Sequence, residues 1–229
     1  RGRDLRLARS AGVGGTAAGM AVDEQVLEER FDAWTIRHPT ELRPLLRLPI
    51  ILWRLGLGPL IGRIDVRGGH LVMLTVTGRS TRLPRHTPLV AHDFDGRTYL
   101  WCPYGDRAQW YHNVGANPVV TVQSGGDLRS MRAVAITDAD EVVRLVAQLR
   151  HFDQTFLRSY LEAEGIADTD ADVATNAGRL HLRRLDPTEE EGPPALPADL
   201  AWVWPVAAAA GLSLAARRVS RRCRRRGTA

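Results

Sequence analysis

Residues 71–89 read LVMLTVTGRSTRLPRHTPL, and this stretch decides the fold class. Residues 71–77 are apolar and rich in β-branched side chains, which predicts a strand. Residues 87–92 predict a second strand, and Gly78 lets the chain turn between the two. The stretch therefore predicts a hairpin whose connecting loop carries several arginines.

Further strands and helices follow this hairpin. Strand patterns occur at residues 98–102, 119–123, 131–136 and 179–185, with turns at Asp95-Gly96 and Ser124-Gly125-Gly126. Helical spacing of apolar residues occurs at 22–35, 41–62, 109–116, 138–149 and 152–164. Five or six short strands with helices inserted late predict an α+β protein that is mainly β. We expect a small, mostly antiparallel barrel.

The chain is long enough for one domain with extensions. It has 229 residues, 44% of them hydrophobic, and no internal repeat. We expect a disordered N-terminal segment at 1–20, rich in Arg, Gly and Ala. The barrel domain with its N-terminal helices would span 21–186. Residues 187–229 would hold an acidic, proline-rich linker, an apolar segment and an Arg-rich tail. Two cysteines and scattered histidines indicate neither a disulfide framework nor a metal site.

The basic charge is concentrated at the two ends of the chain. All 31 basic residues are arginine, and the formal net charge is +5. Four arginines lie in the first nine residues and seven lie between 217 and 226, whereas residues 10–216 hold 20 arginines against 25 acids. Such a tail binds polyanions, either nucleic acid or an anionic membrane. No nucleic-acid recognition motif accompanies it, so we expect no nucleic-acid partner.

Two segments raise the question of membrane contact. Residues 200–216 contain no charge and would span about 25 Å as a helix. Trp202 and Trp204 would suit an interface, whereas Pro205 and the many alanines argue against a span. A spanning anchor, a surface-lying segment and a tail without a role all stay open. The helix at 41–62 would either cover one end of the barrel or lie in the membrane plane. With no secretory signal peptide, we expect a cytoplasmic protein, with the inner face of the membrane as one location.

Two stretches carry candidate chemistry. The loop between the first two strands holds Arg79, Arg82 and Arg85 beside neutral donors, which would suit a phosphate or carboxylate. The other interpretation is a hairpin with ordinary solvated arginines. Residues 104–118 carry Trp110 at the start of a short helix. Its indole would either stack on a planar ligand or plug the barrel end.

Together, and in this order, the two stretches resemble the deazaflavin-dependent nitroreductase family, also described as quinone reductases that use reduced coenzyme F420. The family carries TGR-x-[ST]-G-x-PR-x-x-PL, a DG hairpin, a strand, and WY-x-N-x-x-ANP followed by a V-x-V strand. This chain has TGRSTRLPRHTPL, Asp95-Gly96, TYLWC, WYHNVGANP and VVTVQ in the same register. The resemblance covers roughly residues 55–137, a little over a third of the chain.

The resemblance implies a fold, a cofactor and a set of cofactor-binding residues. The fold would be a split β-barrel of about six antiparallel strands, and the cofactor would be coenzyme F420, with FMN or haem ranked below it. The basic loop would hold the anionic phosphate and lactyl–glutamate tail of F420, and neighbouring residues would line or border the deazaflavin. The residues carried over are Arg79, Ser80 and Arg85 for the tail, Thr87, Pro88 and Leu89 for the ring, and Trp101, Pro103, Tyr104, Gly105 and Trp110 around them.

The resemblance also implies a reaction, namely hydride transfer from reduced F420 to a quinone, a nitro compound or a similar small acceptor. Tyr160, on the late helix, would be the candidate that shapes the substrate site or donates a proton, although a role in the core is an equal alternative. A non-catalytic barrel that holds a cofactor or a lipid is the alternative function. Barrels of this class often form dimers, which makes a homodimer an option.

Three residues depart from the family pattern. Ser80 stands where a basic residue often follows TGR, and this removes one cation. Arg82 replaces a glycine, so the turn must avoid a positive φ or tolerate strain. Pro103 stands in the segment before the tryptophan and has no N–H to donate to a phosphate.

Overall fold

The structure of this protein, a computed structural model, describes the backbone of residues 43–211 and the side chains of residues 47–211. The predicted disordered segment at 1–20, the helix predicted at 22–35 and the Arg-rich tail lie outside the described residues.

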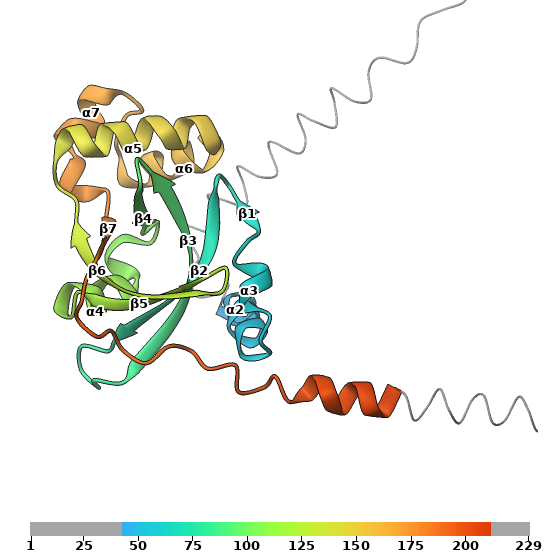
Figure 1. Cartoon of the computed structure of the whole chain (residues 1–229). Helices are drawn as coiled ribbons and strands as arrows, with labels where there is room; N and C mark the ends of the chain where they lie inside the picture. The colour runs from blue at the N-terminus through green and yellow to red at the C-terminus, as the bar shows by residue number, and fades with distance from the viewer. Residues whose placement is uncertain (1–42, 212–229) are drawn as a thin grey trace, which may run out of the picture.

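The fold is a closed, six-stranded antiparallel barrel with one additional short strand (Figure 1). The strand order is β1-β2-β3-β4-β7-β6-β5, and the pairing of β2 with β5 closes the barrel. This confirms the α+β barrel that the sequence predicted. The strands are β1 (Asp65–Val66), β2 (Gly69–Thr77), β3 (Pro84–Phe94), β4 (Arg97–Trp101), β5 (Val119–Ser124), β6 (Asp127–Ala135) and β7 (Leu182–Pro187).

The period of two along each strand fills the barrel interior. On β2, Val72, Leu74 and Val76 are completely buried and pack against residues of the other barrel strands. Their neighbours Met73 and Thr75 point to the outer face, because successive side chains of a strand alternate between faces. The short helix α4 (Gln109–Ala116) adds Trp110 and Val114 to the same interior cluster. Its bounds are those that the sequence predicted.

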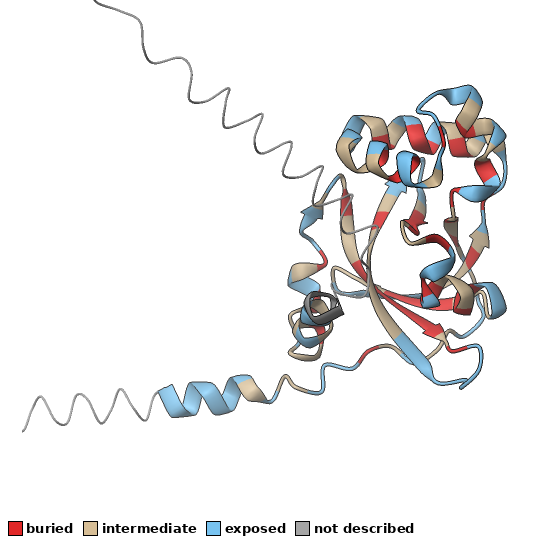
Figure 2. Ribbon diagram, turned by 180° about the vertical axis from the view of Figure 1, so that it is seen from behind, coloured by how far each residue is buried: buried red, intermediate tan, exposed pale blue. Residues whose placement is uncertain are grey.

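A separate helical layer covers β4 and β7 from outside (Figures 1 and 2). Tyr99, Trp101 and Leu182 share one buried cluster with the apolar faces of these helices. The aspartates that precede α5 and α6 cap them, since Asp138 accepts from the Glu141 N–H and Asp153 from the Phe156 N–H. The elements of this layer are α5 (Ala139–Phe152), α6 (Gln154–Glu164), α7 (Asp170–Thr175) and the 3-10 turn η2 (Ala177–Arg179).

Several expected elements differ from what the structure shows. Strand β3 begins at Pro84 rather than at 87, so Arg85 lies on the strand and not in the loop, and β6 begins at Asp127 rather than at 131. The last strand begins at Leu182 rather than at 179, because residues 177–179 form a 3-10 turn. The single helix expected over 41–62 is two helices, α2 (Arg43–Arg54) and α3 (Gly58–Ile61). The chain breaks between them at Gly56, whose φ is +81°. Trp53 packs so closely on Gly58 that a Cβ there would lie 2.5 Å from the indole nitrogen.

Helices α2 and α3 cover the side of the barrel. Trp53 is buried against Met73, on the outer face of β2, and against Leu196. The sequence left open whether this helix covers the barrel or lies in a membrane plane. The structure shows Trp53 packed on the barrel, and the helix covers the side of the barrel rather than an end.

The acidic, proline-rich segment after β7 lies along the barrel. The Thr121 hydroxyl donates to the Pro193 carbonyl at 2.5 Å, and Gln123 makes two hydrogen bonds with the backbone of Leu196. Residues 203–211 are helical. Within residues 43–211, no helix is both long enough and apolar enough to cross a bilayer.

Candidate functional site

The barrel is split where β3 leaves β4. Strand β3 pairs with β2 along Pro84 to Ala91, whereas its pairing with β4 covers only Ala91 to Phe94. Among the described residues, the first half of β3 thus has a strand neighbour on one side only. Helix α4 is inserted into this part of the barrel, with Trp110 in the interior cluster. The split barrel expected from the resemblance is present.

A groove of about 440 Å³ lies between the β2–β3 loop, the start of β3 and α4. The structure brings five of the predicted cofactor-binding residues together in its wall: Arg79, Ser80, Arg85, Thr87 and Trp110. They come from three elements, and residues 79 and 110 are more than thirty positions apart in the sequence. The remaining lining residues are Gly78, Thr81, His86, Gln109 and Asn113.

The groove arginines Arg79 and Arg85, and Arg82 on the neighbouring turn, have only neutral side-chain hydrogen-bond partners among the described residues. The backbone N–H and Nη1 of Arg79 both point to Asn113 Oδ1, at 3.2 and 3.3 Å. Arg85 Nη2 reaches the Thr81 hydroxyl at 3.4 Å, and Arg82 Nη1 donates to Asn117 Oδ1 at 2.7 Å. Because no described carboxylate is paired with these guanidinium groups, the loop carries a net positive charge beside the groove. Such a loop favours an anionic ligand.

The turn that carries Arg79 and Arg82 is held by two backbone hydrogen bonds, from Gly78 N to Leu83 O and from Arg82 N to Gly78 O, both 2.9 Å. Arg82 adopts a φ of +58°. The turn therefore has the left-handed conformation that suits the glycine of the family pattern, and Arg82 adopts this conformation with backbone strain. A strained turn was one of the two outcomes that the sequence left open.

The alternation of β3 separates the three residues expected to line the deazaflavin. Thr87 lies opposite Leu74, and Leu89 lies opposite Val72, so both point to the barrel interior. Pro88 lies opposite Met73 and points to the outer face. Thr87 lines the groove, whereas Leu89 packs against the interior cluster and Pro88 is on the other side of the strand.

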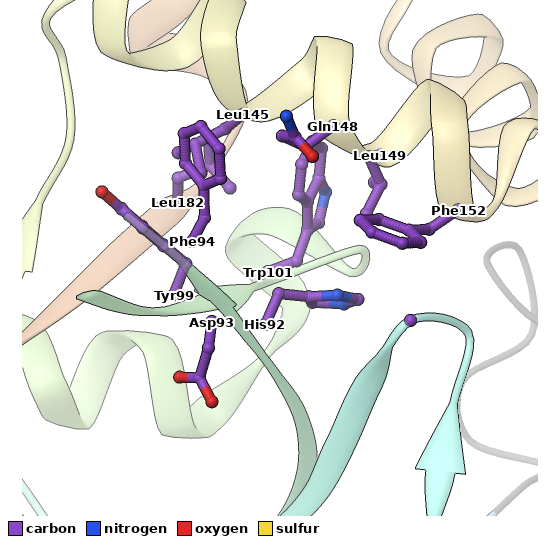
Figure 3. A pocket seen from close by; sticks show the side chains of 11 residues that line it. His92, Asp93, Phe94, Tyr99, Trp101, Leu145, Gln148, Leu149, Phe152 and Leu182 are labelled. Carbon is purple, nitrogen blue, oxygen red and sulfur yellow. The ribbon is translucent and has the colours of Figure 1, made fainter. Parts of the chain in front are cut away.

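Trp101 and Tyr160 lie outside the groove. Trp101 lines a small crevice of about 30 Å³ between α5 and the end of β3–β4, beside Gln148 and Leu149 (Figure 3). Tyr160 is completely buried, and its ring meets Trp101 edge to face at 5.3 Å. This environment is the alternative role in the core that the sequence left open for Tyr160. The crevice has space for about one water molecule, so it does not admit a cofactor.

Pro103 and Tyr104 lie in the loop after β4, and Gly105 is the first residue of the 3-10 turn η1 (Gly105–Arg107), which leads into α4. Gly105 has a φ of +51°, and its carbonyl accepts a hydrogen bond from the Cys102 thiol. Burial raises the pKa of the Tyr104 phenol and raises that of Cys102 to about 12. These three residues do not line the groove. They precede α4 in the chain.

Sequence reasoning gave no site role to Gln109, Asn113 or His86. Gln109 and Asn113 are four residues apart, so they lie on one face of α4. Asn113 is buried and fixes the backbone of Arg79. The sequence signal for this role is the asparagine of the WY-x-N motif, because a polar side chain that is buried requires a hydrogen-bond partner. His86 lies opposite Thr75 on the outer face, with Nδ1 2.9 Å from the Thr75 hydroxyl, and burial lowers its pKa.

The part of the chain that forms this groove is similar to a known protein family. Residues 57–160, which include β2, β3 and α4, match the family described as F420H(2)-dependent quinone reductase. The match covers a little under half of the chain, and over these residues the chain is similar to this family. The F420H(2)-dependent quinone reductase family uses coenzyme F420, so the protein is an F420-dependent reductase with that cofactor. No curated protein matches the chain significantly.

Two solved structures are similar to this reductase over half of its length. One is described as the structure of the F420-H2 dependent reductase FDR-A, with 24% identity and a TM-score of 0.33. The match covers 51% of this chain and 93% of that one. The other is described as a domain-swapped dimer, with 21% identity and a TM-score of 0.27. It covers 51% of this chain and 79% of the other.

The groove of this F420-dependent reductase fits one part of the cofactor in particular. Coenzyme F420 carries an anionic tail, and the groove offers guanidinium groups that no described carboxylate neutralises. The Ser80 and Thr81 hydroxyls lie beside them as neutral donors. The donor set of the loop is therefore one that binds a phosphate or a carboxylate.

Proposed function

We propose that the groove between the β2–β3 loop and α4 holds the cofactor and that the protein reduces a quinone with it. Arg79 and Arg85 would bind the anionic tail of F420, with the Ser80 hydroxyl as a third donor. Thr87 and Trp110 would border the ring at the barrel end of the groove. The observation that carries this proposal is that Arg79 and Arg85, in the wall of this groove, have only neutral side-chain partners among the described residues.

The residues of the chain would orient the cofactor more than they react. When bound, reduced F420 supplies a hydride to the acceptor. Asn113 would hold the loop in place, since it binds both the backbone and the side chain of Arg79. Trp110 is buried at the base of the groove and would keep water from that side.

The proton that accompanies the hydride would come from water at the open side of the groove. Tyr160 is the tyrosine that the sequence put forward for this role, but its hydroxyl is buried and has no hydrogen-bond partner among the described residues. Burial raises the pKa of this phenol further, so it holds its proton tightly. We therefore assign Tyr160 to the packing of α6 against β4.

Quinone is the acceptor that we propose, because the matched family is described by it. A nitro compound is the second acceptor to be compared, since it also takes up a hydride. A homodimer and a cytoplasmic location remain predictions. Gel filtration with light scattering measures the first of these.

The test is a titration of the purified protein with reduced F420, followed by addition of menadione. Recovery of the absorbance of oxidised deazaflavin that depends on protein concentration supports the proposal. Binding without turnover would support the non-catalytic alternative instead. FMN or haem bound to the purified protein would contradict the proposed cofactor.

A further inference from the structure

Two segments far apart in the sequence expose large apolar side chains at the same part of the molecule. One segment is α2 and α3, and the other is the end of the described chain. We call the exposed set the composite surface. Its members are each between 45% and 65% exposed, and they are Leu48, Ile51, Leu60, Trp202, Trp204 and Val206.

Specific bonds hold the two segments side by side. The guanidinium group of Arg54 donates to both carboxylate oxygens of Asp199, at 2.8 and 2.7 Å. The Leu200 N–H donates to the Arg54 carbonyl at 2.9 Å, and the Trp204 indole N–H donates to the Leu55 carbonyl at 2.7 Å. The helix at 203–211 therefore starts beside the end of α2, on the side of the barrel that α2 and α3 cover (Figures 1 and 2).

The charge around the composite surface is positive. Residues 43–64 contain four arginines and no acid, and Asp199, which is paired with Arg54, is the sole acid of residues 198–211. A few residues beyond the described helix, the sequence has seven arginines between positions 217 and 226. A second copy of this chain would bring two such basic runs together and would be repelled. Apolar side chains next to clustered arginines instead match an anionic lipid surface.

We propose that the composite surface inserts into the interface of an anionic lipid bilayer without crossing it. Trp202 and Trp204 would lie at the level of the headgroups, where tryptophan is favoured. The Arg54–Asp199 pair would make α2 and the C-terminal segment act as one surface. This proposal adds a location to the proposed quinone reductase, since quinones with long apolar chains dissolve in membranes, but the lipid contact does not depend on catalysis.

The first test measures flotation of the full chain with vesicles of phosphatidylcholine, with and without phosphatidylglycerol. We expect binding to the anionic vesicles, and at least a tenfold loss of bound protein for both Leu60→Glu and Trp202→Glu. Phe152→Glu is the matched control, because Phe152 is 54% exposed and lies at the end of α5, in the helical layer. Binding of both variants at the level of the unchanged chain would overturn the proposal. Binding to a DNA duplex but not to vesicles would also overturn it.

The second test concerns the pair that joins the two segments. Arg54→Asp and Asp199→Arg should each weaken vesicle binding several-fold, and the double exchange should restore it. If the single variants bind like the unchanged chain, the two segments do not act together. Reduction of menadione in solution, measured alongside, should be unchanged in all of these variants. A chain that binds vesicles but does not reduce menadione would refute the proposed function and leave the lipid surface standing.

Discussion

Replacing Arg85 with alanine tests the proposed binding of the cofactor most directly. Arg85 is exposed in the groove wall, and its guanidinium group reaches the Thr81 hydroxyl at 3.4 Å as its one side-chain hydrogen bond within the described part of the chain. A hydrogen bond between charged groups contributes about 1.5–3 kcal/mol. Because this groove is open to water, we expect the lower end, about 1.5 kcal/mol, which corresponds to roughly a tenfold rise in Kd.

The assay is a titration of F420 that follows deazaflavin fluorescence, at two ionic strengths. Arg85→Ala should bind about tenfold more weakly and lose part of the salt dependence. Arg85→Lys should have an affinity for F420 between those of the unchanged protein and Arg85→Ala, because lysine keeps the charge but not the bidentate donor geometry of arginine. The melting temperature should not change, since Arg85 contributes little to the fold.

The matched control is Arg144→Ala, which removes an exposed guanidinium from α5, outside the groove. It should bind F420 like the unchanged protein. If Arg85→Ala and Arg144→Ala bind with the same affinity as the unchanged protein, Arg85 is not part of the cofactor site and the argument from unneutralised charge is refuted.

Three further predictions concern the fold. Gly165 follows α6 with a φ of +68°, and no atom would crowd a Cβ there. Gly165→Ala should therefore lower the free energy of unfolding in urea by about 1 kcal/mol, the cost of a left-handed conformation. Gly178→Ala is the control, because Gly178 also has open space but no positive φ, and its stability should not fall. Leu196→Ala should lower the free energy of unfolding by about 2–3 kcal/mol, because Leu196 is buried against Trp53. An unchanged free energy of unfolding would mean that the segment after β7 does not stabilise the fold. Burial lowers the pKa of His92; the unfolded chain then binds a proton more readily, so stability should fall as the pH drops below about 6.5. His92→Gln should remove part of that decline, and an identical pH profile for both proteins would contradict it.

The sequence by itself determined the strand order along the chain and the residues of the basic loop. Alternating β-branched residues in β2 and the Gly78 turn are local signals, because a period of two and a turn residue each act over a few positions. The same holds for α4, whose bounds follow from the spacing of its apolar residues and from Asn117-Pro118 after it. The break between α2 and α3 at Gly56 was not predicted, because a glycine in an apolar stretch also occurs inside helices.

Only the tertiary structure decided which of these residues share a site. The pairing of β3 with β4 stops at Ala91, and this opens the groove beside Arg79, Arg85 and Trp110 while it leaves Pro88 on the opposite face. It also decided that Tyr160 packs on Trp101 and that Arg54 meets Asp199 across 145 positions of sequence. Strand register and the docking of helices depend on contacts between distant segments, and no local pattern encodes those distances.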